Sequence, residues 1–158
     1  MKTIKFAFAF AIGIGIVFSS LVVSAPKNSG YDTELAAKLG GDEHGMRHYV
    51  FVILKTGPND ANFKDKARTD LFAGHMANIG KLADQGKLAV AGPFSKNDRN
   101  YRGIFILAVA TIAEAQALVE TDPAVKAGIL IAEMTPWYGS ASLMATPEIH
   151  KKIAKATF

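Results

Sequence analysis

Between residues 47 and 87, the spacing of apolar positions changes from that of a β-strand to that of an α-helix. Residues 47–55 are apolar and rich in β-branched and aromatic side chains, and a Thr-Gly-Pro turn follows them. From Phe63 to Lys87 the apolar positions recur at helical spacing on one stripe, which includes His75, and Gly86 is a helix-stop signal. This half predicts a strand followed by one long amphipathic helix.

The second half predicts two more strands, a helix and a last strand. Residues 88–91 and 103–110 are apolar runs joined by a polar connection. Thr111 and Glu114 have the spacing of a capping box, which predicts a helix as far as about residue 120. Asp122 precedes Pro123 in the pattern of an N-cap and first helical residue, so a short helical turn is expected there. Residues 129–134 predict the last strand, ending at a Thr-Pro-Trp-Tyr-Gly stretch.

The order of these elements is βαββαβ, which predicts an α+β, ferredoxin-like fold with an antiparallel four-stranded sheet and the helices on one face. Alternation along the first strand puts Val50, Val52 and Leu54 on one face and Tyr49, Phe51 and Ile53 on the other. Both faces are therefore apolar, but the helices cover only one. We expect the C-terminal tail, a ligand or a second subunit to cover the other, most simply in a homodimer that closes two sheets face to face.

The two ends of the chain differ in character from the domain at 47–143. Residues 1–25 have a basic start, an apolar stretch and a small-residue exit, which predicts a signal peptide; a retained membrane anchor is the alternative. Residues 26–46 predict a flexible leader with a helical turn around 34–38. Residues 144–158 predict a short amphipathic helix with Ile149 and Ile153 facing inward.

Composition and charge narrow the class of protein. A length of 158 residues predicts one domain. Because the sequence contains no cysteine, disulfide scaffolds, thiolate metal sites and cysteine nucleophiles are excluded. The formal net charge is +4, and it falls to +2 without the two lysines of residues 1–25. No basic stripe interleaved with aromatic residues is left to follow a phosphate backbone, so nucleic acid is not an expected partner. We expect an exported protein, periplasmic or secreted, with no stable membrane anchor after processing.

His75 and Asp122 are the candidate catalytic residues. His75 is expected to point from the helix toward the sheet, and imidazole suits proton transfer at neutral pH. The alternative is a core histidine that is bonded to a backbone carbonyl. Asp122 is expected to cap the turn at Pro123, and its second carboxylate oxygen is free to orient the imidazole of His75. The two roles are compatible with each other.

Four further residues are candidates for binding a substrate. Ser95 follows Phe94 just after a Gly-Pro turn, and its hydroxyl is a candidate donor at the mouth of a pocket; an ordinary turn serine is the alternative. Trp137 and Tyr138 are candidates for the wall of an aromatic pocket, with the core or a dimer interface as the alternative.

The sequence argues against a metal or nucleotide cofactor. His44 and His48 are spaced for a shared helical face beside Asp42 and Glu43, but the flanking glycines and the strand at residue 47 disfavour a helix there. No Gly-rich nucleotide loop and no Gly-x-Ser-x-Gly motif occurs. We therefore predict no metal site and no cofactor.

Five stretches in order resemble the YCII-related family between about Arg47 and Leu143. They are YVFVILKTGP (49–58), HMANIGKLADQGKL (75–88), AGPF (91–94), DPAVKAG (122–128) and PWYG (136–139). The resemblance implies a dimeric α/β barrel of ferredoxin-like subunits, a small-molecule pocket between sheet and helices, and His75 with Asp122 as its acid/base pair. One branch of the family resembles a dehydrochlorinase of hydroxylated aromatics. Two features depart from the family: Phe72 stands where many members have arginine, and export is unusual among them.

The expected function is cofactor-independent general acid/base chemistry, an elimination or isomerisation of a small aromatic or carbonyl compound. The alternatives are an exported protein that binds or senses a small ligand without turnover, and a purely structural role. An imidazole nitrogen close to Asp122 favours the enzyme, whereas a fully buried His75 bonded only to backbone favours the structural role.

Overall fold

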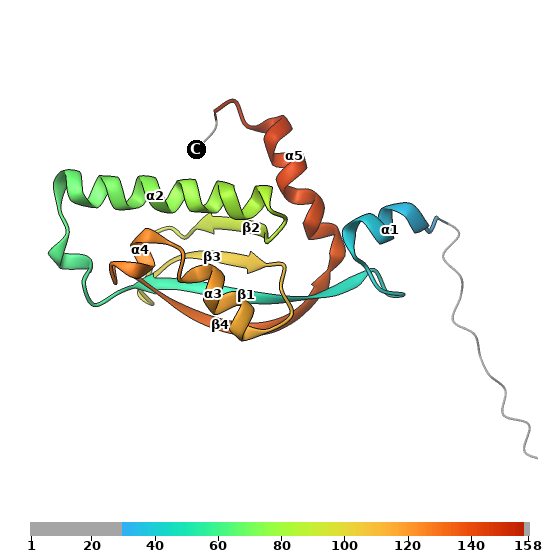
Figure 1. Cartoon of the computed structure of the whole chain (residues 1–158), viewed down its shortest axis with the longest axis horizontal. Helices are drawn as coiled ribbons and strands as arrows, with labels where there is room; N and C mark the ends of the chain where they lie inside the picture. Colours follow the sequence, from blue (N-terminus) through green and yellow to red (C-terminus); the bar gives the residue numbers. More distant parts are fainter. Residues whose placement is uncertain (1–29, 157–158) are drawn as a thin grey trace, which may run out of the picture. The chain divides into compact units, whose positions relative to one another are not determined.

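Four strands form one antiparallel sheet in the order β2-β3-β1-β4 (Figure 1). The strands are β1 (Met46–Thr56), β2 (Leu88–Pro93), β3 (Tyr101–Leu107) and β4 (Leu130–Ser140). The central strand β1 pairs with β3 on one side and with β4 on the other, so β2 and β4 are the edges. The predicted ferredoxin-like βαββαβ arrangement is confirmed.

The computed structural model describes residues 30–156, and the described residues from Asp32 onward belong to one compact unit. The predicted signal peptide at 1–25 and the first part of the predicted leader lie outside the described residues. Among those described, no helix combines the length and the apolar character needed to cross a membrane.

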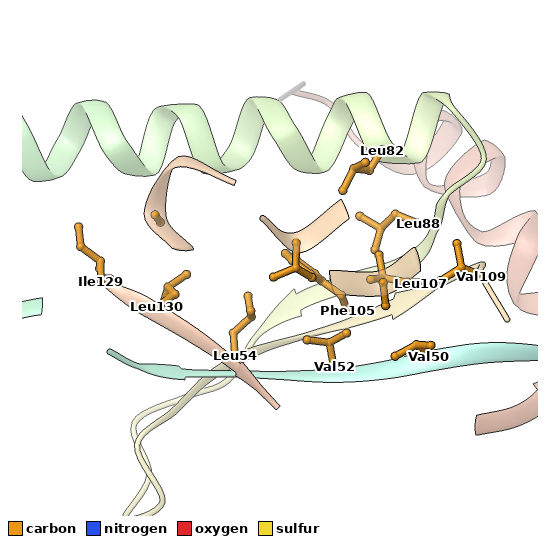
Figure 2. Packing of buried hydrophobic residues seen from close by; sticks show 13 residues of the cluster. Val50, Val52, Leu54, Leu82, Leu88, Phe105, Leu107, Val109, Ile129 and Leu130 are labelled. Atoms are coloured by element: carbon orange, nitrogen blue, oxygen red, sulfur yellow. The ribbon is translucent and has the colours of Figure 1, made fainter. Parts of the chain in front are cut away.

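The helices α2 (Asp65–Asp84), α3 (Ile112–Val119) and α4 (Pro123–Lys126) pack on one face of the sheet. Figure 2 shows Leu82 pointing from α2 toward the sheet, while Val50 and Val52 point from β1 toward the helices. Burial of this cluster removes apolar surface from water and holds α2 over β3 and β1. The main core lies on the face where the sequence predicts it.

The opposite face of the sheet is covered only in part. The 3₁₀ segment η2 (Ala141–Ala145) follows β4 and packs over Tyr49 and Ile106. Phe51 and Ile53, further along β1, are only partly buried, and Trp137 on β4 is exposed. Segment η2, which spans the end of the predicted domain and the start of the predicted tail, thus covers one end of this apolar face and leaves the rest open.

Strand β4 is longer than the sequence predicts. The run TPWYG was expected to end the strand, but pairing with β1 continues through Pro136 to Ser140. Pro136 has no N–H to donate, and β4 is an edge strand, so one side of it makes no ladder bonds. The edge position explains why a proline is tolerated inside this strand.

The long helix is shorter than the predicted 63–87. It begins at Asp65, after a 3₁₀ turn at Asp60–Asn62, and its last residue is Asp84. Gly86 adopts a left-handed φ of 66°, and the backbone N–H groups of Gly86 and Lys87 bond to carbonyls of the last turn. The predicted glycine stop is confirmed, with the helix ending before it.

Part of the predicted flexible leader is helical. Helix α1 (Thr33–Leu39) has Asp32 as its N-cap and Gly40, with φ 69°, as its left-handed C-cap. Arg47 Nη1 donates to the carbonyl of Leu39 at 2.9 Å and ties the helix end to β1. Both caps and this contact stabilise a helix where only a turn was expected.

Helix α5 (Thr146–Ile153) forms as predicted but faces the other way. Ile149 is 55% exposed and Ile153 is 73% exposed, so the expected inward packing of both is wrong. Lys151, on the opposite side of the helix, pairs with Asp84 at the end of α2 at 2.6 Å. The lysine side of α5 therefore faces the domain and the isoleucine side faces away.

Candidate active site at the α2–α4 contact

Helix α2 places His75 over the sheet. The side chain is 10% exposed, and its ring stacks on Phe105 of β3 with centroids 5.9 Å apart and an angle of 25° between the planes. The ring of Phe72, one turn earlier on α2, meets it edge-on at 5.9 Å. Two aromatic rings therefore fix the plane of the imidazole.

Asp122 is fully buried and reaches His75 from α4. Its Oδ1 caps the helix by accepting from the N–H of Ala124 at 2.8 Å and of Val125 at 3.4 Å. Its Oδ2 lies 2.6 Å from Nδ1 of His75. One carboxylate thus caps α4 with one oxygen and contacts the imidazole with the other, and the structure brings the two predicted residues together.

This contact defines the roles of the two ring nitrogens. An ionised Asp122 accepts only, so the neutral imidazole donates its proton from Nδ1 and carries its lone pair on Nε2. Nε2 has no hydrogen bond to any described residue, yet it is not among the buried unpaired polar atoms, which are Arg47 Nε and Asn78 Nδ2. Nε2 is therefore not completely enclosed, and its lone pair has no partner among residues 30–156.

Two further contacts join the same segments, and the sequence analysis missed them. Asn78 Oδ1 lies 3.0 Å from the hydroxyl of Thr121, the residue before Asp122. Gly74, the residue before His75, lies so close to Pro123 that an added Cβ would come within 2.9 Å of the proline Cγ. The sequence did contain one signal for the Asn78–Thr121 bond: Asn78 is a polar residue three positions after His75, which puts it on the same buried side of the helix.

A hollow of about 500 Å³ lies on α2 next to Phe72 and is lined by Arg68, Thr69, Phe72, Ala73 and Met76. The guanidinium of Arg68 lies 5.1 Å from the Phe72 ring centroid and pairs with Asp60 at 2.7 Å. Phe72 borders both the hollow and the imidazole of His75. A planar ligand in this hollow therefore shares an aromatic wall with the candidate base.

The predicted residues Phe94 and Ser95 line another hollow, of about 570 Å³, at the β2–β3 hairpin. The rings of Phe94 and Tyr101 lie 6.0 Å apart there, and Asn97 holds the loop through four hydrogen bonds to its backbone. Neither Phe94 nor Ser95 contacts His75 or Asp122 through a hydrogen bond or ring contact. The structure does not bring them to the His75–Asp122 pair, called the dyad below.

Trp137 and Tyr138 also lie away from the dyad. Trp137 packs on Tyr49, with centroids 5.6 Å apart, on the sheet face that the helices leave open. The hydroxyl of Tyr138 donates to Asp42; this hydrogen bond lowers the pKa of the Asp42 carboxyl and raises the pKa of Tyr138. The structure places Trp137 on the open sheet face, away from His75, and does not place it in a pocket with that residue.

Asp42, Glu43, His44 and His48 are the residues that the sequence brings closest to a metal-binding pattern. Among residues 30–156, no group of three histidine or acidic side chains is arranged to hold a metal ion. Asp42 instead accepts from the backbone N–H groups of His44 and Met46 and from Tyr138. Its oxygens organise the turn before β1.

The fold and the dyad define a ferredoxin-like α+β domain with a histidine–aspartate pair beneath its long helix. The YCII-related domain family matches residues 49–138, more than half of the chain, and the chain belongs to this family. No curated protein matches it. A similar solved structure is 5-chloro-2-hydroxyhydroquinone dehydrochlorinase from Burkholderia phenoliruptrix AC1100 in complex with 2,5-dihydroxybenzoquinone. It is 26% identical, covers 56% of this chain and 92% of its own, and has a TM-score of 0.39, which supports no conclusion about chemistry here.

Replacing Asp122 in two ways separates its two roles. Asp122→Ala removes the cap and the buried bond to His75, and we expect a loss of about 3 kcal/mol in unfolding free energy. Asp122→Asn keeps an oxygen for the cap and is expected to cost clearly less. Urea denaturation measures both, with Asp32→Ala, an exposed N-cap without a histidine partner, as the control for capping alone. Equal costs for the two Asp122 variants would contradict the dual role.

Proposed function

We propose that this protein is a cofactor-independent enzyme that uses His75 as a general base on a small aromatic or carbonyl compound. The observation that carries the proposal is the 2.6 Å contact between His75 Nδ1 and Asp122, which leaves Nε2 without a hydrogen bond to any described residue. Buried polar atoms normally have a hydrogen-bond partner. Here a carboxylate pairs with one ring nitrogen, and the other has no partner among residues 30–156.

The chemistry follows from the tautomer that Asp122 selects. Nε2 takes a proton from an acidic C–H or O–H of the substrate, and the buried carboxylate stabilises the imidazolium that forms. The electron pair left behind forms a double bond, either expelling a leaving group in an elimination or accepting the proton back at another atom in an isomerisation. Both outcomes balance without an added oxidant or reductant.

The walls of the site favour a planar substrate. Phe105 lies under the imidazole and Phe72 meets its edge, so a ligand that reaches Nε2 passes aromatic surface. Aromatic and conjugated carbonyl compounds fit such surfaces, and their C–H or O–H groups are acidic enough for an imidazole base.

Hydrogen–deuterium exchange tests the base without knowledge of the natural substrate. Hydroxybenzoquinones, 1,3-diketones and α-keto acids are incubated with the protein in D₂O, and loss of the acidic C–H signal is followed by NMR. We expect faster exchange for at least one compound and a fall of about 10²-fold or more with His75→Ala. His44→Ala, at an exposed histidine, is the matched control and is expected to retain the wild-type rate.

The results distinguish the enzyme from the alternatives. Unchanged exchange in folded His75→Ala would exclude the catalytic role. A compound that raises the melting temperature of the wild type without exchange or turnover would favour the binding or sensing protein. Absence of both binding and exchange across the panel would favour a structural role.

We also propose that the protein is a homodimer that buries the open sheet face. The support is the row of apolar side chains that η2 leaves uncovered, among them Phe51, Ile53 and the exposed Ile131 and Trp137. Two copies of this face, related by a twofold axis, would bury these apolar side chains against each other, with the Lys55–Glu133 ion pair lying on the same face. Separately, we propose that the protein is exported, because residues 1–25 have the sequence pattern of a signal peptide.

Light scattering after size exclusion tests the dimer. We expect the wild type to have twice the mass of one chain, and Phe51→Asp to be monomeric or to dissociate at least tenfold more readily, because it buries a charge at the interface. Ala77→Asp, exposed on α2, is the control and should leave the dimer intact. A monomeric wild type would contradict the proposal, and circular dichroism shows whether each variant is folded.

A further inference from the structure

We propose that Asn78 and Thr121 are positioning residues that hold Asp122 in register with His75; this inference rests on the proposed function. The two residues have no hydrogen bond to Nε2 of His75 and do not line the hollow beside Phe72. They join α2 to the segment between α3 and α4: Asn78 lies three residues after His75, and Thr121 immediately precedes Asp122.

Three neighbouring contacts make up this junction. Gly74 packs on Pro123, His75 bonds to Asp122, and Asn78 bonds to Thr121. Along α2 these positions cover just over one turn, and their partners are consecutive residues. The His75–Asp122 bond alone joins the two segments at one point, whereas a second polar contact and a close packing contact beside it also limit how the segments slide and turn against each other.

Asn78 is a buried polar side chain with few hydrogen-bond partners. It is 91% buried, and its Nδ2 has no partner among residues 30–156. The Thr121 hydroxyl has one hydrogen to share between the Leu118 carbonyl, at 2.7 Å, and Asn78 Oδ1, at 3.0 Å. A buried amide with an unpaired donor destabilises the fold relative to an apolar side chain of the same size. Buried polar groups of this kind are known to fix one arrangement of packed helices at a cost in stability.

The consequence for the dyad is geometric. A shift of α4 along α2 by about 1 Å would lengthen the 2.6 Å contact beyond hydrogen-bond range. The imidazole would then lose the interaction that selects its tautomer, and Nε2 would carry the proton in part of the molecules. The Asn78–Thr121 bond opposes this shift because it spans the same two segments.

Isosteric substitutions test the inference. Thr121→Val and Asn78→Leu remove the bond while preserving volume, and Thr121→Ser preserves the hydroxyl as the matched control. The readouts are the fraction of Nδ1–H tautomer of His75, from ¹⁵N NMR of histidine-labelled protein, and the exchange rate of the active compound in D₂O. We expect Thr121→Val and Asn78→Leu to show a mixed tautomer and an exchange rate lower by about tenfold, with KM little changed. Thr121→Ser is expected to match the wild type in both.

Each outcome bears on one proposal. A wild-type tautomer in both folded Thr121→Val and folded Asn78→Leu would overturn the positioning role. A mixed tautomer in Thr121→Val but not in Thr121→Ser would support it even if no compound is turned over, because the NMR readout needs no activity. An inactive wild type with this tautomer response would therefore overturn the proposed enzyme and leave the positioning role standing. If Asn78→Leu does not fold, the two Thr121 variants decide the question.

Discussion

The buried contact between His75 and Asp122 is the interaction on which the site depends. It joins the long helix to the short helix α4 through a carboxylate that already caps α4. A buried carboxylate is costly unless its oxygens are paired, and here backbone N–H groups satisfy one oxygen while the imidazole satisfies the other. The same bond that keeps Asp122 paired also leaves the lone pair of the neutral imidazole on Nε2, so the fold and the proposed chemistry share one contact.

The sheet separates this site from the surface proposed for dimerisation. His75 lies on the helix-covered face over Phe105, whereas Phe51 and Trp137 lie on the face that η2 covers only at one end. Because alternate residues of each strand point to opposite faces, one set of strands builds both surfaces. A ligand on one face and a second subunit on the other would therefore not compete for the same side chains.

Most of the architecture was predictable because period, caps and turn residues agree along the chain. The capping box at Thr111 and the cap at Asp122 are local patterns, and both form as predicted. The errors come from tertiary context. Pro136 is tolerated because β4 is an edge strand, and Ile149 lies on the exposed side of α5, opposite Lys151 and its contact with Asp84. In the site, the facing of His75 followed from periodicity, but the Asn78–Thr121 bond depends on how two helices meet, which spacing along one chain does not specify.

The most direct test of the central claim is the protonation of the His75 ring in the wild-type protein, read from the ¹⁵N chemical shifts of the neutral imidazole. The account predicts that Nδ1 carries the proton, hydrogen-bonded to Asp122, and that Nε2 is unprotonated. A neutral ring with its proton on Nε2, or one averaging between tautomers like free imidazole, would contradict it.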